Sequence, residues 1–151
     1  MITFIRHCEC YVYNSNGSIN YMRVNPSLTK DGILRAKTLN GVYDKIILSP
    51  MSRCIETFIY SGINGPREIN ENFREYILCP GDFHENDEID DCLENNEIFK
   101  ERINKSIDYL NTLNGNICVI THSGWLREAL QLNYIPNYGE SIIVNKLNKL
   151  P

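Results

Sequence analysis

The chain has 151 residues, a formal net charge of −4 and a hydrophobic content of 42%. These values are typical of a globular protein and disfavour a disordered chain or a nucleic-acid-binding protein, which needs a basic face. No apolar run approaches the ~18 residues of a membrane span, and the N-terminus does not resemble a secretory signal. We therefore expect a cytoplasmic protein with one domain over residues 1–151, no membrane partner and reduced cysteines.

The first half of the chain predicts two strands, each followed by a helix. An apolar strand at 2–6 ends at Arg6, and the polar segment 8–27 is expected to be a loop. Thr29 is a suitable N-cap for a helix that runs to about Gly41. A second strand at 45–48 leads directly into a helix at 51–61, with Pro50 suited to its first position.

The second half continues the alternation. The expected elements are a short strand at 67–69, a helical turn near 71–76, a helix at 95–113, a strand at 117–121, a helix at 125–132 and a strand at 141–145. Between them, residues 79–97 carry several acidic side chains without Lys or Arg and are expected to form a solvated loop. Alternating strands and helices predict a three-layer α/β/α domain with a mostly parallel central sheet.

Charged and polar side chains follow three of the expected strands. Arg6 and His7 end the first strand, Arg53 lies one helical turn after the second, and His122 follows the buried strand 117–121. In open α/β sheets ligands bind at the carboxyl ends of the strands. Guanidinium groups match phosphate oxygens in a bidentate manner, so these residues together predict a phosphate site, to which a helix after His122 would add backbone N–H groups.

The same segments resemble one family, the histidine phosphatases, which include the cofactor-dependent phosphoglycerate mutases. Residues 6–9 resemble that family's Arg-His-Gly-Glu, and residues 25–29 its Asp-x-Pro-Leu-Thr. Residues 49–57 are similar to its Ser-Pro-Leu-x-Arg-Ala-x-Gln-Thr. Residues 73–75 resemble its Leu-x-Glu, and 121–124 its Ser-His-Gly-Gly. The matches occur in the family's order, and they imply its phosphoglycerate mutase-like fold.

The resemblance implies a mechanism without metal or cofactor. His7 would attack phosphorus and form a phosphohistidine, while Arg6, Arg53 and His122 would bind the phosphate oxygens. Glu75 would protonate the leaving oxygen and then activate water. His7 must be neutral to attack, whereas His122 would be most useful as a cation, so we expect their pKa values to differ.

Some assignments are weaker. Glu71, Asp82 or Glu85 could replace Glu75 as the acid. Ser123 is expected to offer its backbone N–H to phosphate, and Glu9 and Asn14 are candidates for substrate binding.

Two positions depart from the family pattern, because Cys8 and Ser123 stand where the family has glycine. The favoured interpretation of Cys8 is a small side chain that the fold tolerates. Alternatively, it could narrow the pocket, or its thiol could be oxidisable if it is exposed and nearby arginines lower its pKa.

The leading hypothesis is a phosphatase for a small phosphorylated metabolite or a phosphorylated protein side chain. A phosphoglycerate-type mutase is an alternative, but the short chain offers little cover against water. A catalytically weak phospho-ligand-binding relic is the other alternative, although simple binding would need neither His7 nor Glu75. A cysteine-dependent phosphatase is excluded, because no cysteine is followed by arginine at the spacing that chemistry requires.

Overall fold

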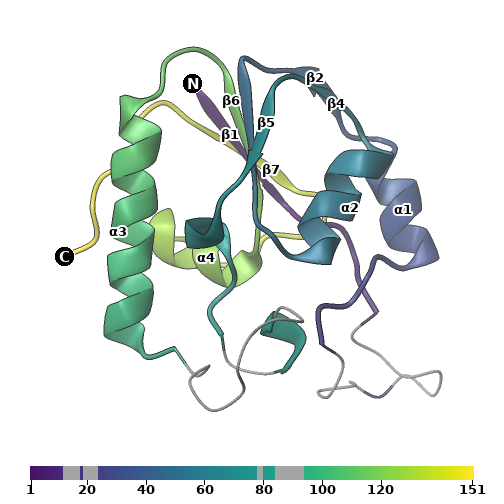
Figure 1. Ribbon diagram of the computed structural model, residues 1–151, viewed down its shortest axis with the longest axis horizontal. Helices are drawn as coiled ribbons and strands as arrows, with labels where there is room; N and C mark the ends of the chain where they lie inside the picture. The colour runs from purple at the N-terminus through teal and green to yellow at the C-terminus, as the bar shows by residue number, and fades with distance from the viewer. Residues whose placement is uncertain (12–17, 19–23, 78–79, 84–93) are drawn as a thin grey trace.

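Figure 1 shows a computed structural model of the chain, which describes residues 1–11, 18, 24–77, 80–83 and 94–151. Its central sheet has five strands in the order β5-β3-β6-β1-β7. The strands are β1 (Ile2–Arg6), β3 (Lys45–Leu48), β5 (Arg67–Ile69), β6 (Ile117–Thr121) and β7 (Ser141–Val144). Neighbouring strands pair in parallel except for β7, which runs antiparallel to β1. The predicted α/β/α fold with a mostly parallel sheet is confirmed.

Two pairs of helices cover the two faces of this sheet (Figure 1). They are α1 (Lys30–Ala36) and α2 (Ser52–Tyr60) on one face, and α3 (Asn96–Thr112) and α4 (Ser123–Ala129) on the other. Successive strand residues point to opposite faces, so Phe4 packs with Trp125 beneath α3 and α4, while Ile5 packs with Cys54 beneath α1 and α2. This double burial explains why the central strands are continuous apolar runs.

Several element boundaries differ from those expected. The helix predicted to reach Gly41 ends at Ala36, because residues 40–42 form β2 (Asn40–Val42), which pairs with β4 (Gly62–Asn64). These three-residue strands lack an apolar pattern and were not predicted. Pro50 precedes α2 rather than opening it, since Met51 is the N-cap residue. Short 3-10 turns, η1 (Glu71–Phe73) and η2 (Pro80–Asp82), connect β5 to the region before α3.

The register of the three central strands places their carboxyl ends together. Arg6 pairs with Thr121, and Leu48 pairs with Ile120, so β1, β3 and β6 end at nearly the same level. The backbone N–H of His7 donates to Thr121 O at 2.9 Å, which extends the pairing by one residue. His7, Ser49 and His122 therefore meet at one edge of the sheet.

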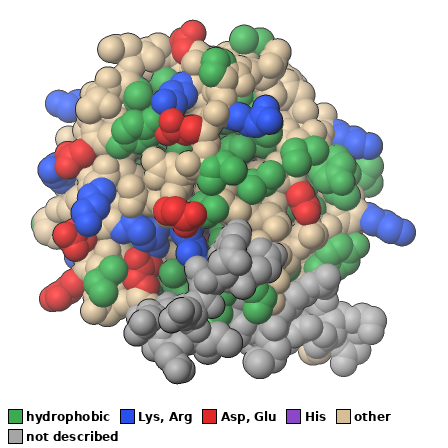
Figure 2. Space-filling model, viewed as in Figure 1, with side chains coloured by type: hydrophobic (Ala, Val, Ile, Leu, Met, Phe, Trp, Pro, Cys, Tyr) green, Lys and Arg blue, Asp and Glu red, His purple; other side chains and the backbone are tan. Residues whose placement is uncertain are grey.

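The surface mixes charge of both signs. On the face seen in Figure 2, basic and acidic side chains of the described residues are interspersed with separate hydrophobic patches. Within the described parts of the chain, no helix has the length and apolar character needed to cross a membrane.

Candidate active site

A cavity of about 140 Å³ lies at the carboxyl end of the central strands. Its described lining consists of Arg6, His7, Cys10, Arg53, Glu75, Gly81, Asp82, Ser123 and Tyr138. The structure thus brings together the predicted nucleophile, both arginines, the predicted acid and Ser123.

His7 is buried in a specific tautomer. Its Nδ1 lies 2.8 Å from Cys8 O, and because a carbonyl oxygen only accepts, Nδ1 must carry the proton. The other ring nitrogen, Nε2, then keeps its lone pair. Burial, followed by the charges of Arg53 and Arg6, lowers the pKa of His7 well below 6.5, so the ring is neutral at neutral pH. The nucleophilic form expected from the sequence is the form that the structure stabilises.

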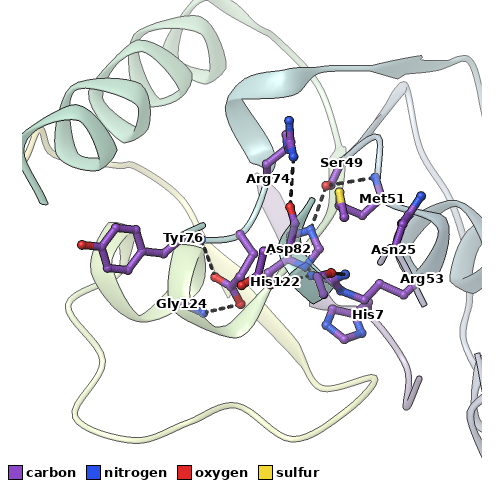
Figure 3. Close-up of polar contacts among 12 residues, drawn as sticks. His7, Asn25, Ser49, Met51, Arg53, Arg74, Tyr76, Asp82, His122 and Gly124 are labelled. Atoms are coloured by element: carbon purple, nitrogen blue, oxygen red, sulfur yellow. Dashed lines mark hydrogen bonds and ion pairs between the residues drawn. The ribbon is translucent and has the colours of Figure 1, made fainter. Parts of the chain in front are cut away.

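His122 is also neutral, and here the structure corrects the sequence-based expectation of a cation. Arg53 Nε donates to His122 Nδ1 at 3.2 Å, so Nδ1 is unprotonated. The proton therefore lies on Nε2, which is 2.8 Å from Ser49 Oγ and can donate to it (Figure 3). Burial first, and then the charge of Arg53, lowers the pKa of His122 well below 6.5. His122 orients Arg53 in this state, and both of its nitrogens are engaged.

Arg53 comes from the first turn of α2, and its side chain is almost fully buried. Besides its bond to His122, it donates from Nη1 to Gly81 O at 2.8 Å and from Nη2 to Asp82 Oδ1 at 3.2 Å. A guanidinium group has five N–H donors, and three of those of Arg53 are bound by described residues, so two are not used by the described part of the chain. Asp82, considered above only as an alternative acid, is instead the charge partner of Arg53.

Arg6 is fixed from the other side of the cavity. Its Nη1 donates to Pro136 O at 2.6 Å, and its guanidinium carbon lies 3.9 Å from the centre of the Tyr138 ring. The buried Nε of Arg6 has no hydrogen-bond partner among the described residues. A buried N–H without an acceptor is unfavourable, so this group favours an anion beside it. Tyr138, whose ring centre lies 5.7 Å from that of His7, had no signal in the sequence because it belongs to an irregular loop before β7.

Glu75 is held against the N-terminus of α4. Its Oε2 accepts from Gly124 N at 3.1 Å and its Oε1 from Tyr76 N at 3.0 Å (Figure 3). Its Oε1 also accepts from Trp125 N at 3.1 Å. Burial outweighs these hydrogen bonds, and with the nearby Asp82 charge it raises the pKa of Glu75 above 4.5. The backbone N–H groups of Gly124 and Trp125, in the first turn of α4, thus bind this carboxyl group.

The structure shows the surroundings of Cys8 and Ser123, the two positions where the sequence departs from the family pattern. Cys8 is fully buried among the apolar residues beneath α1 and α2, and its backbone N–H donates to Thr57 Oγ1 at 2.9 Å. Burial raises the pKa of the Cys8 thiol, which contradicts the alternative of an exposed thiol activated by arginines and agrees with a tolerated small side chain. Ser123 lines the cavity, and its hydroxyl lies 3.4 Å from Glu75 Oε2.

One of the two candidate substrate contacts, Glu9, is not brought into this cavity. Glu9 accepts a hydrogen bond from Thr29 Oγ1 at 2.8 Å, next to the start of α1, and it is absent from the described lining of the cavity. Its observed role is to fix the loop after β1. Asn14 and the alternative acid Glu85 lie outside the described residues. Glu71, the remaining alternative, is exposed and forms an ion pair with Arg74.

Comparison with known proteins agrees with this architecture. No family model and no curated protein matches the sequence. Solved structures do match: an alpha-ribazole phosphatase from Shigella flexneri has 19% identity and a TM-score of 0.69, with 99% of this chain and 95% of that chain covered. A phosphoglycerate mutase from Thermus thermophilus has 17% identity and a TM-score of 0.66, with 97% and 95% covered. This chain has the phosphoglycerate mutase-like fold. The fold predicted from the sequence motifs is therefore confirmed over nearly the whole chain.

A second, larger cavity of about 440 Å³ adjoins the site. Tyr76 and Gly124, which both donate to Glu75, contribute to its described lining together with Lys100 and Arg127. Glu75 and its hydrogen-bond partners therefore form part of the wall between a small polar cavity and a broader groove beside α3 and α4.

Proposed function

We propose that this protein is a phosphatase that hydrolyses a phosphomonoester, or a phosphorylated protein side chain, through a phosphohistidine on His7. One observation carries the proposal. The Nδ1–H of His7 is bound to Cys8 O, which leaves the Nε2 lone pair of a neutral imidazole beside two arginines and a protonatable carboxyl group. Simple anion binding would use neither an unprotonated ring nitrogen nor a carboxyl group with a raised pKa.

The chemistry balances in two steps. His7 Nε2 forms a bond to phosphorus as the ester P–O bond breaks, and Glu75 transfers its proton to the departing oxygen. The resulting Glu75 carboxylate accepts a proton from water, whose oxygen attacks phosphorus as the P–N bond breaks. Arg6 and Arg53 stabilise the equatorial oxygens in both steps, and His122 keeps Arg53 in place.

The charge in the cavity favours hydrolysis over a mutase reaction. Among the described residues that line it, the cations are Arg6 and Arg53, and both lie beside His7. A mutase must also bind a second anionic group on its substrate, whereas here Asp82 adds a negative charge. This balance supports a substrate with a single phosphoryl group at the reacting end.

The test is hydrolysis of p-nitrophenyl phosphate from pH 4 to 8 with chelator present, for the wild type and His7→Ala. We expect His7→Ala to lose at least ~10³-fold in kcat while its thermal unfolding stays cooperative. Lys105→Ala, which alters an exposed residue of α3, is the matched control and should retain full activity. Substantial activity in His7→Ala would remove His7 from its role, and strong inhibition by the chelator would contradict a metal-independent mechanism.

A further inference from the structure

Arg102 is the most completely hydrogen-bonded arginine near the site, although it does not line the cavity. It lies in α3, and its side chain is 15% exposed. Nε donates to Glu94 Oε1 at 2.8 Å and Nη2 to Glu94 Oε2 at 2.6 Å. Its remaining bonds go to the main chain: Nη1 donates to Asn72 O at 3.1 Å and to Arg74 O at 2.8 Å, and Nη2 donates to Glu75 O at 3.0 Å. All five donors of the guanidinium group are therefore used.

The three carbonyl groups belong to the short segment that carries the proposed acid. The turn η1 bends the chain so that the carbonyls of Asn72, Arg74 and Glu75 converge on one guanidinium group. Buried carbonyl oxygens need donors, and a single planar group with several N–H donors satisfies all three. Trp125 Nε1 also donates to Asn72 O at 3.1 Å, which ties the same segment to α4.

Glu75 is thus held at both of its ends. Arg102 binds its main-chain carbonyl, while Gly124 N and Trp125 N bind its carboxyl group. The next residue, Tyr76, stacks on Phe99 of α3 with ring centres 4.7 Å apart, and Arg102 lies over the same Phe99 ring. The main chain at residue 75 can therefore move little relative to α3 and α4.

The influence of Arg102 on Glu75 is positional. Arg102 is paired with Glu94 through two short hydrogen bonds, and the arginine among the leading causes of the shifted pKa of Glu75 is Arg53. General acid catalysis requires the carboxyl group within hydrogen-bond reach of the leaving oxygen, and a displacement of about 1 Å can cost ~10²-fold in rate. A residue that fixes the main chain of the acid therefore affects the step in which that acid acts.

We infer that Arg102 is a positioning residue for proton transfer by Glu75, through its hydrogen bonds to the carbonyls of residues 72, 74 and 75. This inference rests on the proposed role of Glu75 as general acid. Helix α3 contributes no described residue to the cavity lining. Through Arg102 it would nevertheless affect the chemical step, because it holds the main chain of the general acid in place.

The test compares kcat/KM for aryl phosphates whose leaving groups range from p-nitrophenol to phenol. A poor leaving group needs the acid, whereas p-nitrophenolate departs without it. Arg102→Met should lose ~10²-fold on phenyl phosphate but less than about fivefold on p-nitrophenyl phosphate. Lys105→Met removes an exposed cation from the same helix and should change neither rate. Arg102→Lys keeps the charge but not the planar guanidinium group, so its loss on phenyl phosphate should lie between those of the wild type and Arg102→Met. It provides a milder variant if Arg102→Met does not fold.

The double variant Glu75→Gln/Arg102→Met separates positioning from general destabilisation. If Arg102 acts through Glu75, adding Arg102→Met to Glu75→Gln should cause no further loss on phenyl phosphate. Equal losses on both substrates, or multiplicative losses in the double variant, would overturn the positioning role. If Glu75→Gln loses the same kcat/KM on both substrates, Glu75 is not the general acid and the proposed function is wrong at that residue. If Glu75→Gln loses far more on phenyl phosphate but Arg102→Met does not, only the positioning role of Arg102 is rejected.

Discussion

A methyl group added at residue 124 should displace the proposed acid without disturbing the rest of the fold. A Cβ built on Gly124 would lie 2.3 Å from Glu75 Oε1 and 3.1 Å from Glu75 Cδ. Ordinary contacts of a Cβ lie at 3.4 Å or more, so the carboxyl group must retreat by about 1 Å. Glycine is therefore required here because of the close approach of Glu75.

The magnitude follows from what this shift does to catalysis and to stability. Moving a general acid by about 1 Å should cost ~10²-fold in kcat for a poor leaving group. Replacing Gly by Ala within a helix raises the free energy of unfolding by about 1 kcal/mol. Weakened hydrogen bonds to Glu75 lower it by about 1–3 kcal/mol, so the two effects partly cancel. Gly124→Ala should therefore keep a cooperative fold while losing activity on alkyl and phenyl phosphates.

The assay is kcat on phenyl and p-nitrophenyl phosphate together with thermal unfolding. Gly62→Ala is the matched control, because a Cβ at that position would meet Asn40 Cβ at 3.4 Å, an ordinary contact. We expect full activity for Gly62→Ala and a selective loss on phenyl phosphate for Gly124→Ala. Unchanged kinetics on phenyl phosphate for Gly124→Ala would refute the argument, since the methyl group cannot coexist with Glu75 as observed.

Two further predictions concern charge in the cavity. Asp82→Asn removes the carboxylate that competes for Arg53, so inorganic phosphate should inhibit more strongly, by ~10-fold or about 1.4 kcal/mol; an unchanged or weaker inhibition constant would argue against competition. The pH profile of kcat/KM should rise through the pKa of His7, lowered below 6.5, and fall through that of Glu75, raised above 4.5. Neutral His7 and protonated Glu75 are the active forms. The lowered pKa of His7 therefore extends the active pH range on its acidic side, and the raised pKa of Glu75 extends it on its basic side. Asp82→Asn should move the basic limb to lower pH because Asp82 raises the pKa of Glu75, and an acidic limb above pH 6.5 would contradict a neutral His7.

The central elements were predictable because burial on both faces leaves a strong trace in the sequence. Residues 117–121 are all buried, and the apolar run there matches β6 residue for residue. Helix ends were less predictable. Apolar spacing suggested a helix from Thr29 to about Gly41, but Leu34 is 61% exposed and the helix ends at Ala36. Apolar residues beyond a helix can still pack against it, so their pattern does not fix where its hydrogen bonds end.

The grouping of the two histidines with the arginines was predictable from the ends of the strands, whereas the protonation of the histidines was not. Parallel strands bring residues that follow them to one edge, which is why His7, Arg53 and His122 could be grouped from the sequence. The state of His122 depends on Arg53 Nε and Ser49 Oγ, whose positions relative to the ring no sequence pattern encodes. Similarly, nothing in the acidic character of residues 79–97 distinguishes Asp82, which pairs with Arg53, from its neighbours.

The neutral state of both histidines has a consequence for how the proposed site would bind phosphate. Two buried histidine cations near two arginines would repel one another, and the desolvation cost would lower their pKa values until they lost their protons. Permanent positive charge is therefore supplied by arginines, which cannot be neutralised in this way. His122 then serves better as an acceptor that orients Arg53 than as a cation, and its proton, directed to Ser49, keeps Nδ1 available for that purpose. Replacing the ring of His122 by a side chain that cannot accept a hydrogen bond would be expected to release the guanidinium group of Arg53. The position of this positive charge therefore depends on the tautomer of a neutral histidine.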